Sequence, residues 1–224
     1  MPDLESKGVF PGVQWESGDP ETLGFDSARL AAVGKWQGEH ADESPYRLLV
    51  VRHGRIAAEW HGGGMGPEDL QGQASASKST YSTVLGIAIG EGVISSADDL
   101  VADYYPEFMD VAPDEGPKEN RYAFPENARI TFRQMIGNMS GYMKPEESPG
   151  RTFNYQTFGM NVVTHALASE YSLYRSSDPE RGAGFGRLAE RKLRNLIDGS
   201  WKWVYSNFDL QPKAKLGVFG YATT

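Results

Sequence analysis

The chain has 224 residues, 39% of them hydrophobic, and carries enough Trp, Tyr and Phe to fill a core. This composition is typical of a globular protein with one large domain or two small ones. The formal net charge of −8, with no run of Lys or Arg, argues against a nucleic-acid partner. The absence of cysteine excludes disulfides, thiolate catalysis and cysteine-based metal sites.

The N-terminus has no basic segment followed by an apolar stretch, so no secretory signal is expected. The longest apolar runs, such as residues 84–89, are far too short to span a bilayer, and no membrane partner is expected. We therefore expect a protein that is cytoplasmic by default. A periplasmic or secreted protein whose signal has been removed would look the same.

The first structured region predicts one helix and one hairpin. A helix begins at Asp26 or Ser27, either of which can cap it. Its apolar residues lie roughly on one face: Leu30, Val33 and Trp36. Two apolar runs, residues 47–51 and 56–60, then flank a short turn that contains Gly54 and predict a β-hairpin.

The segment from Ser75 to Glu91 gives the clearest helical pattern. Apolar residues recur there at i, i+3, i+4 and i+7, namely Tyr81, Val84, Leu85 and Ala88. Residues 95–108 predict a short capped helix that ends at Pro106. Residues 111–127, which are rich in Pro, Asp, Glu and Asn, predict a surface loop.

Two further helices follow. One begins at Thr131 and ends near Ser140 and Gly141. The other covers residues 157–171 and turns four residues inward: Val162, Val163, Ala166 and Leu167. Residues 175–187 are polar and glycine-rich and predict a mobile loop. A sheet followed mainly by helices favours an α+β fold over alternating β–α units.

Ser75-Ala76-Ser77-Lys78 is an S-x-x-K motif, and Lys78 is the only lysine with a serine three residues before it. At a helix start, residues i and i+3 share a face, so the amine of Lys78 can reach the Ser75 hydroxyl. The free N–H groups and dipole of the helix start can stabilise an oxyanion. By itself the motif is weak evidence for catalysis, because an ordinary capped helix with a surface lysine can have the same four-residue pattern.

The sequence around the motif resembles the β-lactamase-related serine hydrolases, which include penicillin-binding proteins, esterases and 6-aminohexanoate-dimer hydrolases. The resemblance covers roughly residues 23–171. Its landmarks occur in the family's order and lie in the stretches 75–108, 130–142 and 149–155. It implies a β-lactamase/DD-peptidase-like fold, an antiparallel sheet flanked by helices plus a helical subdomain. It also implies that Ser75 is the nucleophile and Lys78 its partner.

By the same resemblance, Tyr155 is the catalytic tyrosine that follows a Pro-Gly turn. The family motif is Tyr-x-Asn, whereas this chain has Tyr155-Gln156-Thr157, which puts the third position in doubt as a substrate anchor. A literal Tyr-x-Asn begins at Tyr205, where we expect a residue that lines the substrate cleft. Tyr155 is preferred as the catalytic residue because it follows the expected lead-in.

The family's third motif, Lys- or His-x-Gly on a C-terminal strand, has no convincing match. Lys215-Leu216-Gly217 has the spacing but an apolar middle residue. We expect one incomplete hydrolase domain: residues 1–70 with the helix and hairpin, 71–200 mainly helical, and 201–224 beginning the C-terminal sheet, whose later strands are missing. A gene fragment is favoured. A complementing chain, or self-association that covers the open sheet edge, remains as an alternative.

The expected activity is hydrolysis of a small ester or amide through an acyl-enzyme, with a β-lactam or D-amino-acid peptide as further substrate classes. The alternative is a ligand-binding or inactive module without turnover. The four histidines have neither H-x-H nor H-x-x-x-H spacing, and no phosphate-binding glycine loop is present. No cofactor or metal is therefore expected.

Overall fold

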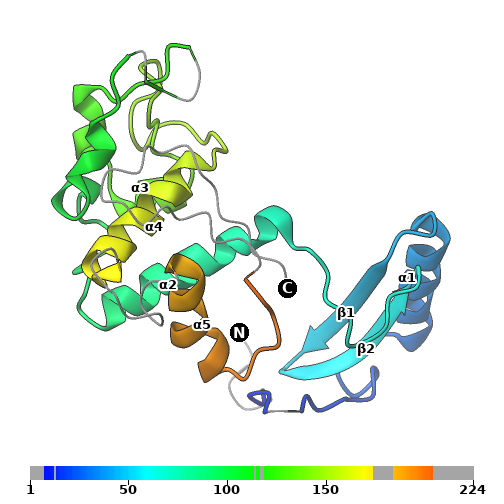
Figure 1. Ribbon diagram of the computed structural model, residues 1–224. Helices are drawn as coiled ribbons and strands as arrows, with labels where there is room; N and C mark the ends of the chain where they lie inside the picture. The colour runs from blue at the N-terminus through cyan, green and yellow to red at the C-terminus, as the bar shows by residue number, and fades with distance from the viewer. Residues whose placement is uncertain (1–7, 13, 114, 117–118, 174–183, 204–224) are drawn as a thin grey trace. The chain divides into compact units, whose positions relative to one another are not determined.

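The computed structural model describes residues 8–12, 14–113, 115–116, 119–173 and 184–203. The chain divides into two compact units, residues 1–70 and residues 71–224. Figure 1 shows the two-stranded sheet with α1 in the first unit and the remaining helices in the second. Each unit is described separately below.

The first unit consists of α1 (Ser27–His40), β1 (Tyr46–Arg52) and β2 (Arg55–Gly62). The side chain of Asp26 caps α1 by accepting a hydrogen bond from the Arg29 N–H at 2.9 Å. The strands form an antiparallel hairpin, as predicted. Both turn residues, His53 and Gly54, have positive φ values of 54° and 74°, which matches the type I′ turn preferred by two-residue hairpin loops.

The contact face of α1 differs from the predicted one. Leu30 and Gly34 are buried, whereas Val33 and Trp36 keep 46% and 57% of their surfaces exposed. The cause is a close approach at Gly34, where an added Cβ atom would lie 2.3 Å from the ring of Trp60 on β2. Only glycine allows this approach, so the helix contacts the sheet along its i, i+4 line through Leu30.

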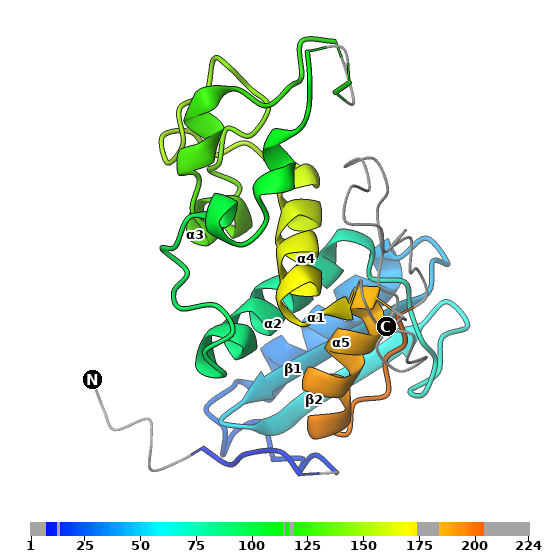
Figure 2. The ribbon, with the colours of Figure 1, turned by 60° about the vertical axis from the view of Figure 1, so that its left-hand side comes forward.

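The second unit is built on α2 (Lys78–Gly90), α3 (Phe132–Ile136), α4 (Phe158–Glu170) and α5 (Gly184–Lys192). Figures 1 and 2 show α4 and α5 against α2, and both helices contact it. The predicted inward residues of α2 and α4 are all buried. The core of this unit also contains large side chains from the connecting segments, among them Ile94, Phe108, Ile130, Phe132 and Tyr142.

Residues 95–108 do not form the single capped helix that was expected. They contain two 3₁₀ turns, η2 (Val101–Asp103) and η3 (Pro106–Met109), and Pro106 begins the second turn instead of ending a helix. The Val101 N–H donates to the Ile130 carbonyl at 2.9 Å, so the backbone here bonds to a distant segment and cannot continue a helix.

Two loop predictions also need correction. The stretch 111–127 includes the start of η4 (Pro125–Arg129), and Asn127 is fully buried. Of the predicted mobile loop at 175–187, residues 175–183 lie outside the described part of the chain, and residues 184–187 belong to α5. The ring of Phe185 is buried against Tyr81, with ring centroids 4.6 Å apart, which explains why this end of the segment is helical.

Taken unit by unit, the elements are those of an α+β protein, with a hairpin followed by helices. No helix within the described ranges is long and apolar enough to cross a membrane.

Candidate active site

Ser75 lies in a 3₁₀ turn, η1 (Ala74–Ser77), and α2 begins at Lys78 immediately after it. The Nζ of Lys78 donates a hydrogen bond to the Oγ of Ser75 at 2.8 Å. In a 3₁₀ turn residues i and i+3 are eclipsed, so the two side chains align more directly than in an α-helix. The predicted pair is therefore together, although Ser75 precedes the α-helix instead of opening it.

Ala74, the residue before Ser75, has a positive φ of 41°. Residues other than glycine, asparagine and aspartate rarely adopt this conformation, and the strain is of order 1–2 kcal/mol. The turn leaves Ser75 exposed, while Ser77 on the opposite side is buried. The strained residue thus accompanies a turn that presents the serine hydroxyl to solvent. Sequence reasoning did not single out Ala74, because a positive φ at alanine has no sequence signal.

Tyr155 lies beside the same amine. The Lys78 Nζ is 5.1 Å from the centroid of the Tyr155 ring, within the range of a cation–π contact. Hydrogen bonding to Lys78 is the main cause that lowers the pKa of the Tyr155 phenol, and hydrogen bonding to Ser75 is the second. The tyrosine is 53% exposed, so solvent reaches the phenol. Ser75, Lys78 and Tyr155 therefore form one cluster within the second unit.

The segment that carries Tyr155 alternates between exposed and half-buried residues. Phe153 and Tyr155 are exposed at 68% and 53%, whereas Asn154 and Gln156 are half-buried. The side chain of Asn154 donates to the carboxylate of Glu147 at 2.6 Å. This alternation turns the asparagine and the glutamine toward the preceding loop and leaves Tyr155 facing solvent.

That loop requires glycine at one position. Gly141 has a φ of 60°, and an added Cβ atom would lie 2.1 Å from the carbonyl oxygen of Glu147. The Ser-Gly turn at residues 140–141 therefore has a steric cause. Lys144 and Glu147 form an ion pair at 3.3 Å with side chains only 9% and 13% exposed, which holds the loop together.

The remaining predicted site residues fall elsewhere. Tyr205 and the Lys215-Leu216-Gly217 segment lie outside the described residues. Thr157 precedes α4 and makes no side-chain capping bond to it. Trp203 packs its ring against Tyr81 at 5.7 Å. Both Trp201 and Trp203 are partly buried and pack against the core of the second unit.

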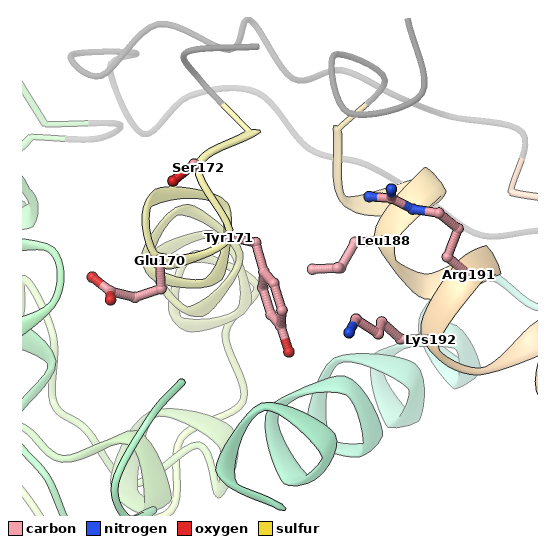
Figure 3. Close-up of a pocket in the computed structure, with 6 residues that line it drawn as sticks. All are labelled: Glu170, Tyr171, Ser172, Leu188, Arg191 and Lys192. Atoms are coloured by element: carbon pink, nitrogen blue, oxygen red, sulfur yellow. The ribbon is translucent and has the colours of Figure 1, made fainter. Parts of the chain in front are cut away.

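A pocket of about 450 Å³ lies between the end of α4 and α5. Figure 3 shows the Tyr171 hydroxyl pointing toward α2 and the Lys192 side chain extending from α5 toward Tyr171. Both side chains bond to Glu91, with Lys192 Nζ 2.7 Å from its Oε1. Glu91 follows the last residue of α2, and Lys78 is its first residue, so about 20 Å of helix separates this pocket from the serine cluster. The pocket holds none of Ser75, Lys78 and Tyr155.

Within the part of the chain that the structure describes, no group of three or more His, Asp or Glu side chains could hold a metal ion. The chemistry available at the cluster is that of a hydroxyl, an amine and a phenol of lowered pKa. Such a set can remove the proton of a serine hydroxyl and return it to a leaving group.

An α+β fold with a serine–lysine pair from an S-x-x-K motif is the arrangement of the β-lactamases and penicillin-binding proteins. The β-lactamase family model matches residues 46–176, which is more than half of the sequence. This chain belongs to the β-lactamase family.

The chain is also similar to a solved structure from Bacillus anthracis that carries the name of a 6-aminohexanoate-dimer hydrolase. The TM-score is 0.53 at 13% sequence identity, over 84% of this chain. At 13% identity, this structural similarity shows a shared fold and nothing further. The chain spans about half of that protein, 52% of its length. No curated protein sequence matches the chain.

Proposed function

We propose that this protein is a serine hydrolase that forms an acyl-enzyme at Ser75. The observation that carries the proposal is the 2.8 Å hydrogen bond between Lys78 Nζ and Ser75 Oγ, with the Tyr155 ring 5.1 Å from the same nitrogen. The i, i+3 spacing alone accounts for the contact of Lys78 with Ser75, whereas the contact with Tyr155 joins a segment 77 residues away to the same amine.

In this mechanism the phenolate of Tyr155 takes the proton from the Ser75 hydroxyl while Oγ bonds to the substrate carbonyl carbon. The Lys78 ammonium stabilises the phenolate, and backbone N–H groups at the turn, including that of Ser75, bind the oxyanion. The tetrahedral adduct expels the alkoxide or amine, which receives the proton from Tyr155. Water, deprotonated by the same phenolate, then attacks the acyl carbon. The second adduct expels Ser75 Oγ, which takes that proton back from Tyr155, and the acid leaves.

The substrate is a small ester or short linear amide. The support is the exposed, solvent-facing cluster and the fold shared with the protein named a 6-aminohexanoate-dimer hydrolase. A β-lactam or a D-amino-acid peptide presents the same carbonyl chemistry, so penicillin and a D-alanyl peptide belong in the substrate panel.

The test is p-nitrophenyl butyrate hydrolysis, together with fluorophosphonate labelling located by mass spectrometry. The wild-type chain is expected to hydrolyse the ester and to carry the label at Ser75, and the Ser75→Ala variant is expected to lose both. The matched control is Ser82→Ala. Ser82 is an exposed serine of α2, and its hydroxyl donates to the Ser79 carbonyl at 2.8 Å.

Equal hydrolysis by wild type and Ser75→Ala, with no label at Ser75, would rule out this function. Labelling at Ser75 with one burst of p-nitrophenol and no further release would instead establish a module that is acylated without turnover. The control variant should match the wild type in both measurements.

A further inference from the structure

Asn138 lies just after the end of α3 in the left-handed conformation, which asparagine adopts more readily than other residues with a side chain. Its φ is 54°. The Asn138 N–H donates to the Met135 carbonyl at 3.2 Å, and the Met139 N–H donates to the Gln134 carbonyl at 2.9 Å. This pair of bonds is the Schellman motif, with Asn138 at the left-handed position that usually carries glycine.

From this position Asn138 holds both residues that flank Tyr155. Its backbone carbonyl accepts the Asn154 N–H at 2.8 Å, and its side-chain Oδ1 accepts the Gln156 N–H at 3.0 Å. One residue therefore anchors the chain immediately before and immediately after Tyr155. Glycine would meet the conformational demand of the cap at lower cost, but it has no atom to accept the second bond.

We propose that Asn138 is the positioning residue for Tyr155, and that its side-chain oxygen holds the phenol against Lys78 and Ser75. The inference rests on the proposed role of Tyr155 in proton transfer. Asn138 touches none of the reacting atoms and acts through the backbone on both sides of the tyrosine. A displacement of about 1 Å at a catalytic group lowers the rate by up to about a hundredfold.

The Asn138→Gly variant isolates this role. Glycine keeps the left-handed conformation, the helix cap and the backbone carbonyl that binds Asn154, and it removes the side chain with the Oδ1 that accepts the Gln156 N–H. Asn138→Asp restores an acceptor at the same place. Asn120→Gly is the matched control, because Asn120 is an exposed asparagine of the same unit with a φ of 59°.

Two measurements test the inference. In ester hydrolysis, Asn138→Gly is expected to lower kcat/KM by about ten- to a hundredfold, with most of the loss in kcat, a melting temperature close to that of the wild type, and partial recovery in Asn138→Asp. In NMR titrations of ¹³C-labelled tyrosine, with Tyr155→Phe for assignment, Asn138→Gly is expected to raise the pKa of Tyr155 toward its ordinary value.

The two measurements separate the possible failures. If Asn138→Gly matches Asn120→Gly and the wild type in kcat/KM and in the Tyr155 titration, the positioning role is wrong and Ser75 chemistry is unaffected. If the wild type neither hydrolyses esters nor labels at Ser75, the proposed function fails. The titration still decides whether Asn138 holds Tyr155 against Lys78, because it needs no turnover.

Discussion

The cluster of Ser75, Lys78 and Tyr155 depends on one cation placed between a hydroxyl and an aromatic ring. The ammonium of Lys78 bonds to the serine oxygen at 2.8 Å and stabilises the negative form of the neighbouring phenol, so the pKa of Tyr155 lies below its ordinary range. A phenol of ordinary pKa would be almost fully protonated at neutral pH and a poor base. In the proposed mechanism the lysine therefore sets the pH range in which Tyr155 can act as the base.

This dependence predicts a specific pH profile. In the wild type, kcat/KM should rise with pH through the lowered pKa of Tyr155, because only the phenolate accepts the serine proton. Lys78→Met removes the cation, so the rise should move to higher pH, toward the ordinary tyrosine value of about 10, with a lower rate at neutral pH. The measurement is kcat/KM for p-nitrophenyl butyrate between pH 5 and 10.

Tyr155→Phe should lower kcat/KM by about 10²–10⁴-fold and remove this rise altogether. Tyr46→Phe, which removes the hydroxyl of a tyrosine on β1, serves as the control and should keep the wild-type profile. An unchanged profile in Lys78→Met would show that the lysine does not set the ionisation of Tyr155.

At the scale of elements, two helical glycines have opposite surroundings. Gly34 of α1 lies against Trp60, 2.3 Å from an added Cβ atom, whereas Gly86 of α2 has nothing within 4 Å of that position. Glycine costs about 0.5–1 kcal/mol in a helix relative to alanine. A Gly→Ala substitution should therefore stabilise the protein at one of these positions and destabilise it at the other.

Gly86→Ala should increase the free energy of unfolding by about 0.5–1 kcal/mol, because alanine restricts the unfolded chain and meets no neighbour. Gly34→Ala should decrease it by about 1–3 kcal/mol, because the rigid ring of Trp60 has to move. Urea denaturation monitored by circular dichroism measures both. A stabilised Gly34→Ala variant would contradict the close contact between α1 and β2.

At the scale of the whole molecule, the largest core lies in the second unit and encloses His165. This side chain is 6% exposed and its ring stacks on Tyr105, with centroids 5.2 Å apart. Burial lowers the pKa of His165 to about 4, because the charged form loses its hydration. Between this value and the unfolded value of about 6.5, the unfolded chain binds more protons than the folded one.

Stability should therefore be lost as the pH falls from about 6.5 to about 4, by up to about 3 kcal/mol for this group. The measurement is the free energy of unfolding from pH 7.5 to 4 for wild type and His165→Gln. The variant should be less stable at neutral pH, and the difference should shrink toward pH 4. The two proteins have the same carboxylates, so a difference in the pH dependence of their stability comes from His165. Parallel plots of unfolding free energy against pH would therefore contradict a lowered pKa at His165.

The sequence and the structure agree best where a pattern is local. The i, i+3 spacing of Ser75 and Lys78 places them together at a helix start, and the periodicity of α2 correctly gives its four buried residues. The four residues predicted for α4 are also buried, but so are all the others from 159 to 168. The helix predicted to begin at Thr131 is capped by that residue, with Gln134 completing a capping box, but it ends at Ile136 and not near Ser140. Each of these features depends on residues within about two turns of one another.

Features that join distant segments were missed. Asn138 lies 18 residues before Gln156, and its place after α3 could have marked a helix cap but not its bond to the Gln156 N–H. The contact face of α1 depends on Trp60 of another element, so Val33 and Trp36 were wrongly grouped with Leu30. The incomplete-domain assignment, the roles of Tyr205 and the cover of the hairpin edge remain predictions.

The sequence by itself determined the α+β class, the serine–lysine pair and the family resemblance, because short-range spacing and ordered motifs are written directly in the chain. The family resemblance named Tyr155, but only the tertiary structure shows what holds it beside Lys78, namely the contact with that amine and the bonds from the flanking N–H groups to the carbonyl and Oδ1 of Asn138. The physical reason is that a side chain 77 residues away from its partner is placed by packing and by backbone hydrogen bonds between segments, which no local pattern encodes.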